Sequence, residues 1–129
     1  MAEWSTINEL CDRVRETSFD LHRYLRHGHL EKVYERALAH RLSKLGVRGE
    51  TQHPLCVFDE DGTQIGEYYA DLFLEGVLIV ELKATRTVSN DHVSQILGYL
   101  RASRMEHGLL INFGAPKLFI KKFILDRVD

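Results

Sequence analysis

The sequence has no apolar run approaching the ~20 residues that a membrane-spanning helix requires, although 44% of its residues are hydrophobic. It also lacks internal repeats, linkers and low-complexity segments, so we expect its 129 residues to form one domain around one core. The opening residues, MAEWSTINEL, are polar and acidic, which is not the pattern of a secretory signal. These absences predict a soluble, cytoplasmic, single-domain protein.

The sequence has only two cysteines, and its positive and negative side chains are nearly equal in number. Cys11 and Cys56 lack the short spacing of metal ligands, and we expect two buried thiols in a reducing compartment. A formal net charge of −2 gives no overall attraction to nucleic acid, so such binding has to come from local groups of cations. The candidates, each of which could instead be an ordinary solvated charge, are Lys83, Arg86, Arg101, Arg104, Lys117, Lys121 and Lys122.

The first 46 residues have the apolar spacing of helices. Residues 5–26 predict one helix, with Ser5 as a candidate N-cap and Ser18 as a candidate interruption. In residues 27–46 apolar side chains recur every three or four positions, and Gly46 is the expected stop.

From residue 50 the apolar period changes to two, which is typical of strands. Strands are predicted at 54–58, 67–74 and 77–85, then a helix at 89–103 with Ser89 or Asn90 as N-cap, then strands at 107–113 and 117–125. The order α-α-β-β-β-α-β-β predicts a single-domain α/β fold, with a mixed central β-sheet flanked by helices.

The register of the hairpin between residues 67–74 and 77–85 follows from its apolar side chains. Pairing Leu72 with Val80 places two alternating apolar sets on one buried face. It leaves a three-residue loop, 75–77, in which Gly76 is available for a positive φ. The two sets are Ala70, Leu72 and Leu74 on one strand, and Leu78, Val80 and Leu82 on the other.

This register places two acidic residues opposite each other. Asp71 faces Glu81 on the other side of the hairpin, and Lys83 lies two residues further along. Opposed Cβ atoms are roughly 4.5–5.5 Å apart, where like charges are destabilising. A divalent cation with oxygen ligands is the natural compensation, since Mg²⁺ binds one or two carboxylates. The alternative is a surface cluster in which Lys83 alone balances the two acids.

Two further groups of polar residues could join this site. Glu31 lies on the apolar side of the second helix, where it could supply a third carboxylate or simply favour the positive end of the helix dipole. Gln95 and Tyr99 are four residues apart on the third helix, and His92 lies one turn earlier. They could line a groove beside the sheet, or form an ordinary polar flank.

Together these residues resemble the PD-(D/E)XK nuclease superfamily. Ala70-Asp71 and Glu81-Leu82-Lys83 fit its pattern, with alanine in place of proline. Residues 28–34, GHLEKVY, resemble the small bacterial GxxExxY group, and the sequence VSQILGYL at 93–100 resembles the Gln-x-x-x-Tyr feature of RecB-type exonucleases. GLLINFG, at 108–114, is similar to the group's last block. The resemblance covers residues 27–125, after an N-terminal helical segment at 1–26.

The resemblance implies a restriction-endonuclease-like fold and a metal-dependent nuclease. Asp71, Glu81, the backbone carbonyl of Leu82 and Glu31 would hold Mg²⁺ or Mn²⁺, which would polarise the scissile phosphate and lower the pKa of a bound water. Lys83 would orient that water or stabilise charge in the transition state. The catalytic set is therefore Asp71, Glu81, Lys83 and Glu31.

The partner that the resemblance implies is nucleic acid, with DNA favoured over RNA. Residues expected to contact it or to support the metal ligands are Gln95, Tyr99, His92, Arg86 and Tyr34. Small nucleases often dimerise, and the segment LFIKKFIL at 118–125 could serve a homodimer interface or be a core strand. The alternative function is a catalytically silent nuclease fold that binds nucleic acid or another protein.

Overall fold

A computed structural model describes residues 6–125 of the chain. Its elements follow the predicted order: α1 (Ile7–Leu25), α2 (Glu31–Lys44), β1 (Gly49–Phe58), β2 (Gln64–Leu74), β3 (Leu78–Lys83), α3 (Asn90–Ser103), β4 (His107–Asn112) and β5 (Phe119–Ile124). Within these described residues, no helix is both long and apolar enough to cross a membrane.

The helix ends follow local capping chemistry. Thr6 caps α1, since its side chain accepts a hydrogen bond from the Glu9 N–H at 3.1 Å; the predicted cap, Ser5, lies outside the described residues. Ser18 does not interrupt α1, because its small side chain is buried inside one continuous helix. Gly46 follows α2 with φ 84°, which confirms the predicted stop. Ser89 caps α3, as predicted.

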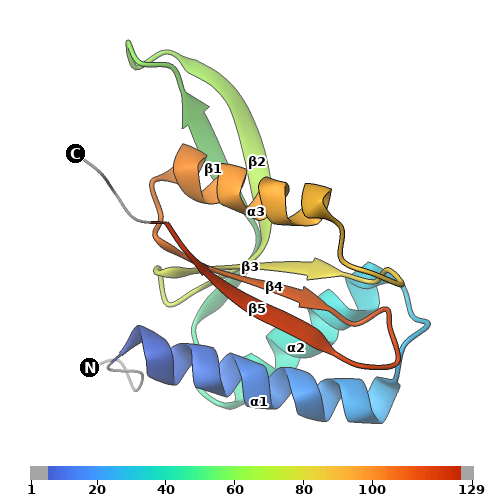
Figure 1. Ribbon diagram of the computed structural model, residues 1–129. Coiled ribbons are helices and arrows are strands. Elements are labelled where there is room, and N and C mark those ends of the chain that lie inside the picture. Colours follow the sequence, from blue (N-terminus) through green and yellow to red (C-terminus); the bar gives the residue numbers. More distant parts are fainter. Residues whose placement is uncertain (1–5, 126–129) are drawn as a thin grey trace.

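The strands form one five-stranded mixed sheet in the order β1-β2-β3-β4-β5. β3 and β4 are parallel, and the other neighbours are antiparallel. Helices α1 and α2 cover one face and α3 covers the other (Figure 1). The sheet flanked by helices is therefore confirmed.

The larger core lies between α1, α2 and the sheet, and the smaller core lies under α3. The larger one includes Leu10, Val14, Tyr34, Leu38, Leu72, Val80, Ile111 and Phe113. The smaller one consists of Leu55, Ala70, Ile79 and Leu100, with half-buried side chains around them. Cys11 is buried, which raises the pKa of its thiol, while Cys56 is only half-buried and so departs from the prediction.

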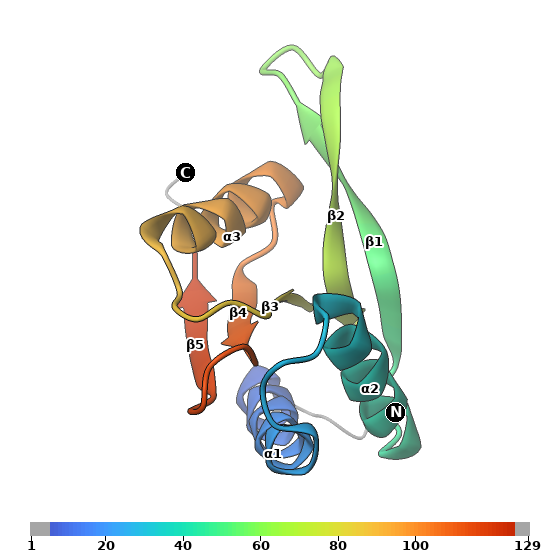
Figure 2. The same cartoon turned by 90° about the vertical axis from the view of Figure 1, so that its right-hand side faces the viewer.

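The register of β2 and β3 confirms the prediction, with Leu72 opposite Val80 and Leu74 opposite Leu78. The loop at 75–77 has φ 52° at Glu75 and φ 69° at Gly76. The ladder ends at the Leu72–Val80 pair, and β1 and β2 continue away from β3 as a two-stranded arm (Figure 2). We call the point where β2 separates from β3 the fork.

The predicted sheet differs from the structure in where β1 and β2 begin and in the packing of Ala70. β2 begins at Gln64 rather than at residue 67. β1 begins at Gly49 rather than at residue 54. The prediction missed its first residues because they are polar and mostly exposed and therefore show no alternation of apolar side chains. Ala70 does not share the core of Leu72 and Leu74 but packs in the smaller cluster beneath α3. The twist of β2 beyond the fork explains this difference, since a right-handed strand twist progressively turns one strand face toward a new neighbour.

Candidate metal and catalytic site

The fork brings the two predicted carboxylates together. The Asp71 N–H lies 3.4 Å from Glu81 Oε1, and the Leu82 N–H donates a hydrogen bond of 2.8 Å to Asp71 Oδ2. Glu81 is 4% exposed, and Asp71 is half-buried. The acidic pair therefore lies at the boundary between the sheet and solvent.

The electrostatics of this pair are unfavourable in the absence of a cation. Burial, followed by the negative charge of Asp71, raises the pKa of Glu81 to about 9. A carboxylate that is both desolvated and next to a second carboxylate holds its proton at neutral pH. A cation would stabilise the ionised form of both acids, and the two carboxylates match the number of protein ligands that Mg²⁺ commonly uses. The carboxylates of Asp71 and Glu81 are thus suitable ligands for a divalent cation.

The main chain of Leu82 adds an oxygen to this donor set. In an extended strand the N–H and C=O of one residue point to the same side. Because the Leu82 N–H points to Asp71, the Leu82 carbonyl is directed to the same side of β3. This geometry agrees with the ligand role that the resemblance implies for that carbonyl.

Lys83 and Gln95 lie side by side at the end of β3. The Lys83 Nζ donates a hydrogen bond of 2.9 Å to Gln95 Oε1 from the exposed side of α3. The charge of Lys83 lowers the pKa of Glu81, against the larger effects that raise it. A positive charge therefore stands beside the acidic pair, as the sequence predicts.

Tyr99 faces the same acidic pair from the next turn of α3. Partial burial, and then the charges of Glu81 and Asp71, raise the pKa of its hydroxyl. Its ring centroid is 4.8 Å from that of Tyr68 on β2, so the two rings join α3 to the arm. Gln95 and Tyr99 thus bring two polar groups of α3 close to the end of β3 and the acidic pair, while the groove itself stays a prediction.

The other residues predicted on this side have different surroundings. The His92 ring accepts a hydrogen bond of 3.1 Å from the Ser89 N–H, and it completes the capping box of α3. Arg86 is exposed on the segment between β3 and α3. The role of either residue toward nucleic acid stays a prediction.

The segment 28–34 has a clear structural logic. Gly28 adopts φ 112°, a conformation that strains any other residue. Tyr34 is fully buried, and its hydroxyl donates to the Arg26 carbonyl at 2.5 Å and accepts from the His29 N–H at 3.2 Å. Its ring stacks on Phe113 at 4.7 Å. Tyr34 thus anchors the turn that leads into the first residue of α2.

Glu31 is that first residue. It is exposed, yet partial burial and then the charge of Asp71 raise the pKa of its carboxyl, so it lies within electrostatic reach of the acidic pair. In the part of the chain that the structure describes, no three His, Cys, Asp or Glu side chains form a group able to hold a metal ion. Hydrogen bonds place Asp71 and Glu81 together, and Glu31 is near enough for the charge of Asp71 to raise the pKa of its carboxyl.

Sequence reasoning missed Gln52 and Glu35. The Gln52 side-chain amide donates to Glu35 Oε1 at 2.6 Å and to Asp71 Oδ1 at 3.2 Å. Glu35 is buried, and a buried acid four residues after Glu31 was a readable signal, because acidic residues are rarely buried without a partner. Gln52 gave no signal, since it lies in the polar part of β1 that was not predicted to be a strand.

The predicted group of cations does not form one surface. Lys122 donates to Asn8 of α1 at 3.1 Å, whereas the Lys121 ammonium lies 5.3 Å from the ring centroid of Phe123, which packs in the smaller core under α3. Lys83 and Arg86 lie at the end of β3 and just beyond it. Lys121 and Lys122 therefore lie on opposite faces of the sheet and do not share one surface.

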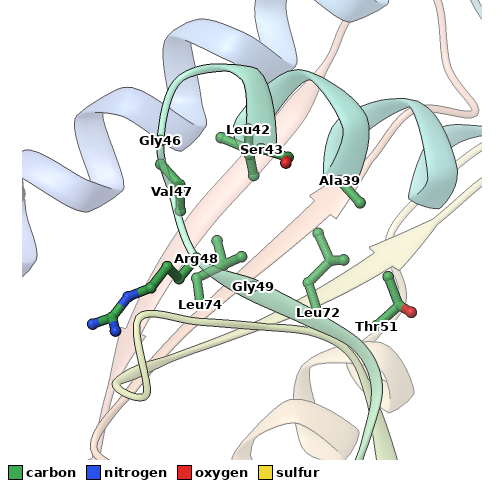
Figure 3. A pocket seen from close by; sticks show the side chains of 10 residues that line it. All are labelled: Ala39, Leu42, Ser43, Gly46, Val47, Arg48, Gly49, Thr51, Leu72 and Leu74. Atoms are coloured by element: carbon green, nitrogen blue, oxygen red, sulfur yellow. The ribbon is translucent and has the colours of Figure 1, made fainter.

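A cavity of ≈370 Å³ lies elsewhere, between the end of α2 and the start of β1 (Figure 3). Its lining includes Leu42, Val47, Leu72 and Leu74, and Arg48 is its charged member, with no acidic side chain. In Figure 3 the Arg48 side chain extends away from the rest of the lining. This cavity has no acidic side chain or histidine in its lining, so it does not compete with the fork as a metal site.

Comparison with known proteins agrees with the fold. The family model of the PD-(D/E)XK nuclease superfamily matches residues 8–123. A solved structure, titled "Crystal structure of SSO0001", superposes with a TM-score of 0.62 at 18% identity, covering 89% of this chain and 60% of that chain. At this identity it shows the fold alone, and no curated protein matches. On the family match, the chain belongs to the PD-(D/E)XK nuclease superfamily.

Proposed function

We propose that this protein is a nuclease of the GxxExxY group that uses Mg²⁺ or Mn²⁺ to hydrolyse phosphodiester bonds in nucleic acid, DNA rather than RNA. The observation that carries the proposal is the pair Asp71 and Glu81, which face each other at the fork beside the positive charge of Lys83. Gly28, Glu31 and Tyr34 support the finer family assignment. Gly28 forms the turn before α2, the Tyr34 hydroxyl holds that turn, and Glu31 is the first residue of α2 and lies near Asp71.

Each residue of the site has a role that its surroundings support. Asp71, Glu81 and the Leu82 carbonyl would hold the cation, and Glu31 would add a carboxylate from α2. A divalent cation bound there supplies Lewis acidity toward a phosphoryl oxygen and lowers the pKa of a coordinated water. The Lys83 ammonium, held by the Gln95 amide, would stabilise negative charge that develops on the phosphate.

The distribution of charge suggests how nucleic acid approaches. The arm, residues 52–71 of β1, β2 and the turn between them, has five acidic residues, Asp71 included, and no lysine or arginine. A phosphate backbone would be repelled by the arm and attracted to the end of β3, where Lys83 and Arg86 lie. We therefore place the nucleic acid across the β3–α3 segment, with a small number of phosphate contacts and a modest salt dependence.

The test is a calorimetric titration of Mn²⁺ and Mg²⁺ into the wild type, Asp71→Asn and the exposed control Asp12→Asn, with a cleavage screen on DNA and RNA using the same samples. We expect metal binding and metal-dependent cleavage in the wild type and the control, and neither in Asp71→Asn. Wild-type protein that binds no metal refutes the proposal. Metal binding without cleavage of any substrate would instead favour a catalytically silent binding module.

A further inference from the structure

A chain of hydrogen bonds connects α2 to the acidic pair through β1. The Gln52 Nε2 group donates to Glu35 Oε1 at 2.6 Å and to Asp71 Oδ1 at 3.2 Å. Both acceptors are carboxylates, so the amide has to present its NH₂ group, and not its oxygen, toward both of them. The Gln52 side chain therefore connects a buried acid of α2 to the metal-facing acid of β2.

The far end of this chain is firmly held. The Glu35 side chain is 6% exposed, and its Oε2 accepts a hydrogen bond of 2.9 Å from the Lys32 ammonium. Its two oxygens are thus divided between Lys32 and Gln52. A buried carboxylate with a fixed geometry is a suitable anchor for the amide of Gln52, because charge-assisted hydrogen bonds are short and directional.

The backbone of Gln52 is unusual in a way that the sheet alone does not require. Its φ is 51°, in the left-handed region that few residues other than glycine adopt. On either side of it Thr51 pairs with Leu72 and His53 pairs with Ala70, while Gln52 takes no part in the ladder. Strained residues of this kind concentrate at functional sites, where the strain places a side chain. Here the strained residue is the one opposite Asp71.

The two oxygens of Asp71 are both constrained as a result. Oδ1 accepts from Gln52 and Oδ2 accepts from the Leu82 N–H, so the plane of the carboxylate cannot rotate without breaking one of the two bonds. Each carboxylate oxygen has two lone-pair sites, so both still have capacity for a cation. The donors on opposite sides of Asp71 come from β1 and β3, the two strands next to β2.

We propose that Gln52 is a positioning residue, anchored by Glu35, that fixes the Asp71 carboxylate in the orientation needed to bind the divalent cation. This inference rests on the proposed function, because it concerns the same cation. It assigns Gln52 and Glu35 no contact with the cation or the substrate. Both residues act through Asp71.

The test uses calorimetric Mn²⁺ affinity and thermal unfolding of the full chain. Gln52→Met keeps the length of the side chain and removes the donor, and Gln52→Gly also removes the donor but relieves the left-handed backbone. Loss of a residue that orients a metal ligand typically weakens metal affinity about 10–100-fold. We expect a loss of this size in both variants, while Gln52→Gly unfolds at or above the wild-type temperature. Gln64→Met, an exposed glutamine on the arm, is the matched control.

Glu35 provides an independent comparison. Glu35→Gln keeps an oxygen that can accept from Gln52, whereas Glu35→Met removes it, so the methionine variant should lose more Mn²⁺ affinity. Wild-type affinity in both folded Gln52 variants overturns the inference and leaves the proposed function standing. Equal affinity in the two Glu35 variants overturns the anchoring role. Absence of Mn²⁺ binding in the wild type overturns both the function and this inference.

Discussion

Glu81 should make the metal-free protein less stable as the pH rises through the neutral range. Its folded-state pKa is raised from 4.5 to about 9, by burial first and then by the charge of Asp71. Between these two values the folded protein binds more protons than the unfolded chain does. Unfolding free energy falls with increasing pH under that condition, so the stabilising proton is fully present below pH 4.5 and is lost as the pH approaches 9.

The size of the effect follows from the width of this window. Each pH unit is equivalent to about 1.4 kcal/mol for one proton. From pH 4.5 to pH 7 the ionisation of Glu81 in the unfolded chain alone should therefore cost about 3 kcal/mol of folding free energy. For a chain of this size, that corresponds to a fall of roughly 10 °C in the unfolding temperature.

The assay is urea unfolding at pH 5, 6, 7 and 8 in a chelator, for the wild type and Glu81→Gln. The glutamine variant cannot ionise at this position, so we expect its unfolding free energy to fall less than that of the wild type between pH 5 and pH 8, and to exceed that of the wild type at pH 7. Because all other titrating groups are shared, the difference between the two proteins isolates Glu81. Parallel stability curves for the two proteins would refute the electrostatic description of the site.

Three other predictions concern single residues. Lys83→Ala should lower the rate of cleavage about 100-fold and leave Mn²⁺ affinity nearly unchanged, because an ammonium is not a ligand; intact cleavage in this variant contradicts its catalytic role. Glu31→Gln should weaken Mn²⁺ affinity in calorimetry, and an unchanged affinity would return Glu31 to a helix-dipole role. Tyr34→Phe should cost about 0.5–1.5 kcal/mol in urea unfolding, since it removes the hydrogen bond that the hydroxyl donates to the Arg26 carbonyl; a stability equal to that of wild type would contradict the anchoring of the turn at 26–29.

The register at the fork was predictable because the side-chain period of a strand is two. A slip of one residue would have moved the apolar set of β3 out of the larger core to the opposite face of the sheet, so the two alternating sets select the pairing of Leu72 with Val80. The pairing then determines which polar residues meet. Asp71 and Glu81 could be placed opposite each other without any knowledge of the rest of the fold.

The connection from α2 to Asp71 was not predictable, because the apolar period of two is absent where Gln52 lies. Gln52 lies in a polar, mostly exposed part of β1 that carries no alternation of apolar residues, and its left-handed φ takes it out of the ladder. Its partner Glu35 is 17 residues away in the sequence. Local periodicity reports which face of an element is buried, but a hydrogen bond between two elements depends on how they pack.

The end of the β2–β3 ladder is what makes this place chemically useful. If the register continued, Leu82 would lie opposite Ala70, and its N–H and carbonyl would be used in pairing with β2. Because the strands separate first, the N–H of Leu82 is free to fix Asp71, and its carbonyl remains available on the same side. The separation of the strands, and not the depth of a pocket, therefore creates the donor set at the fork.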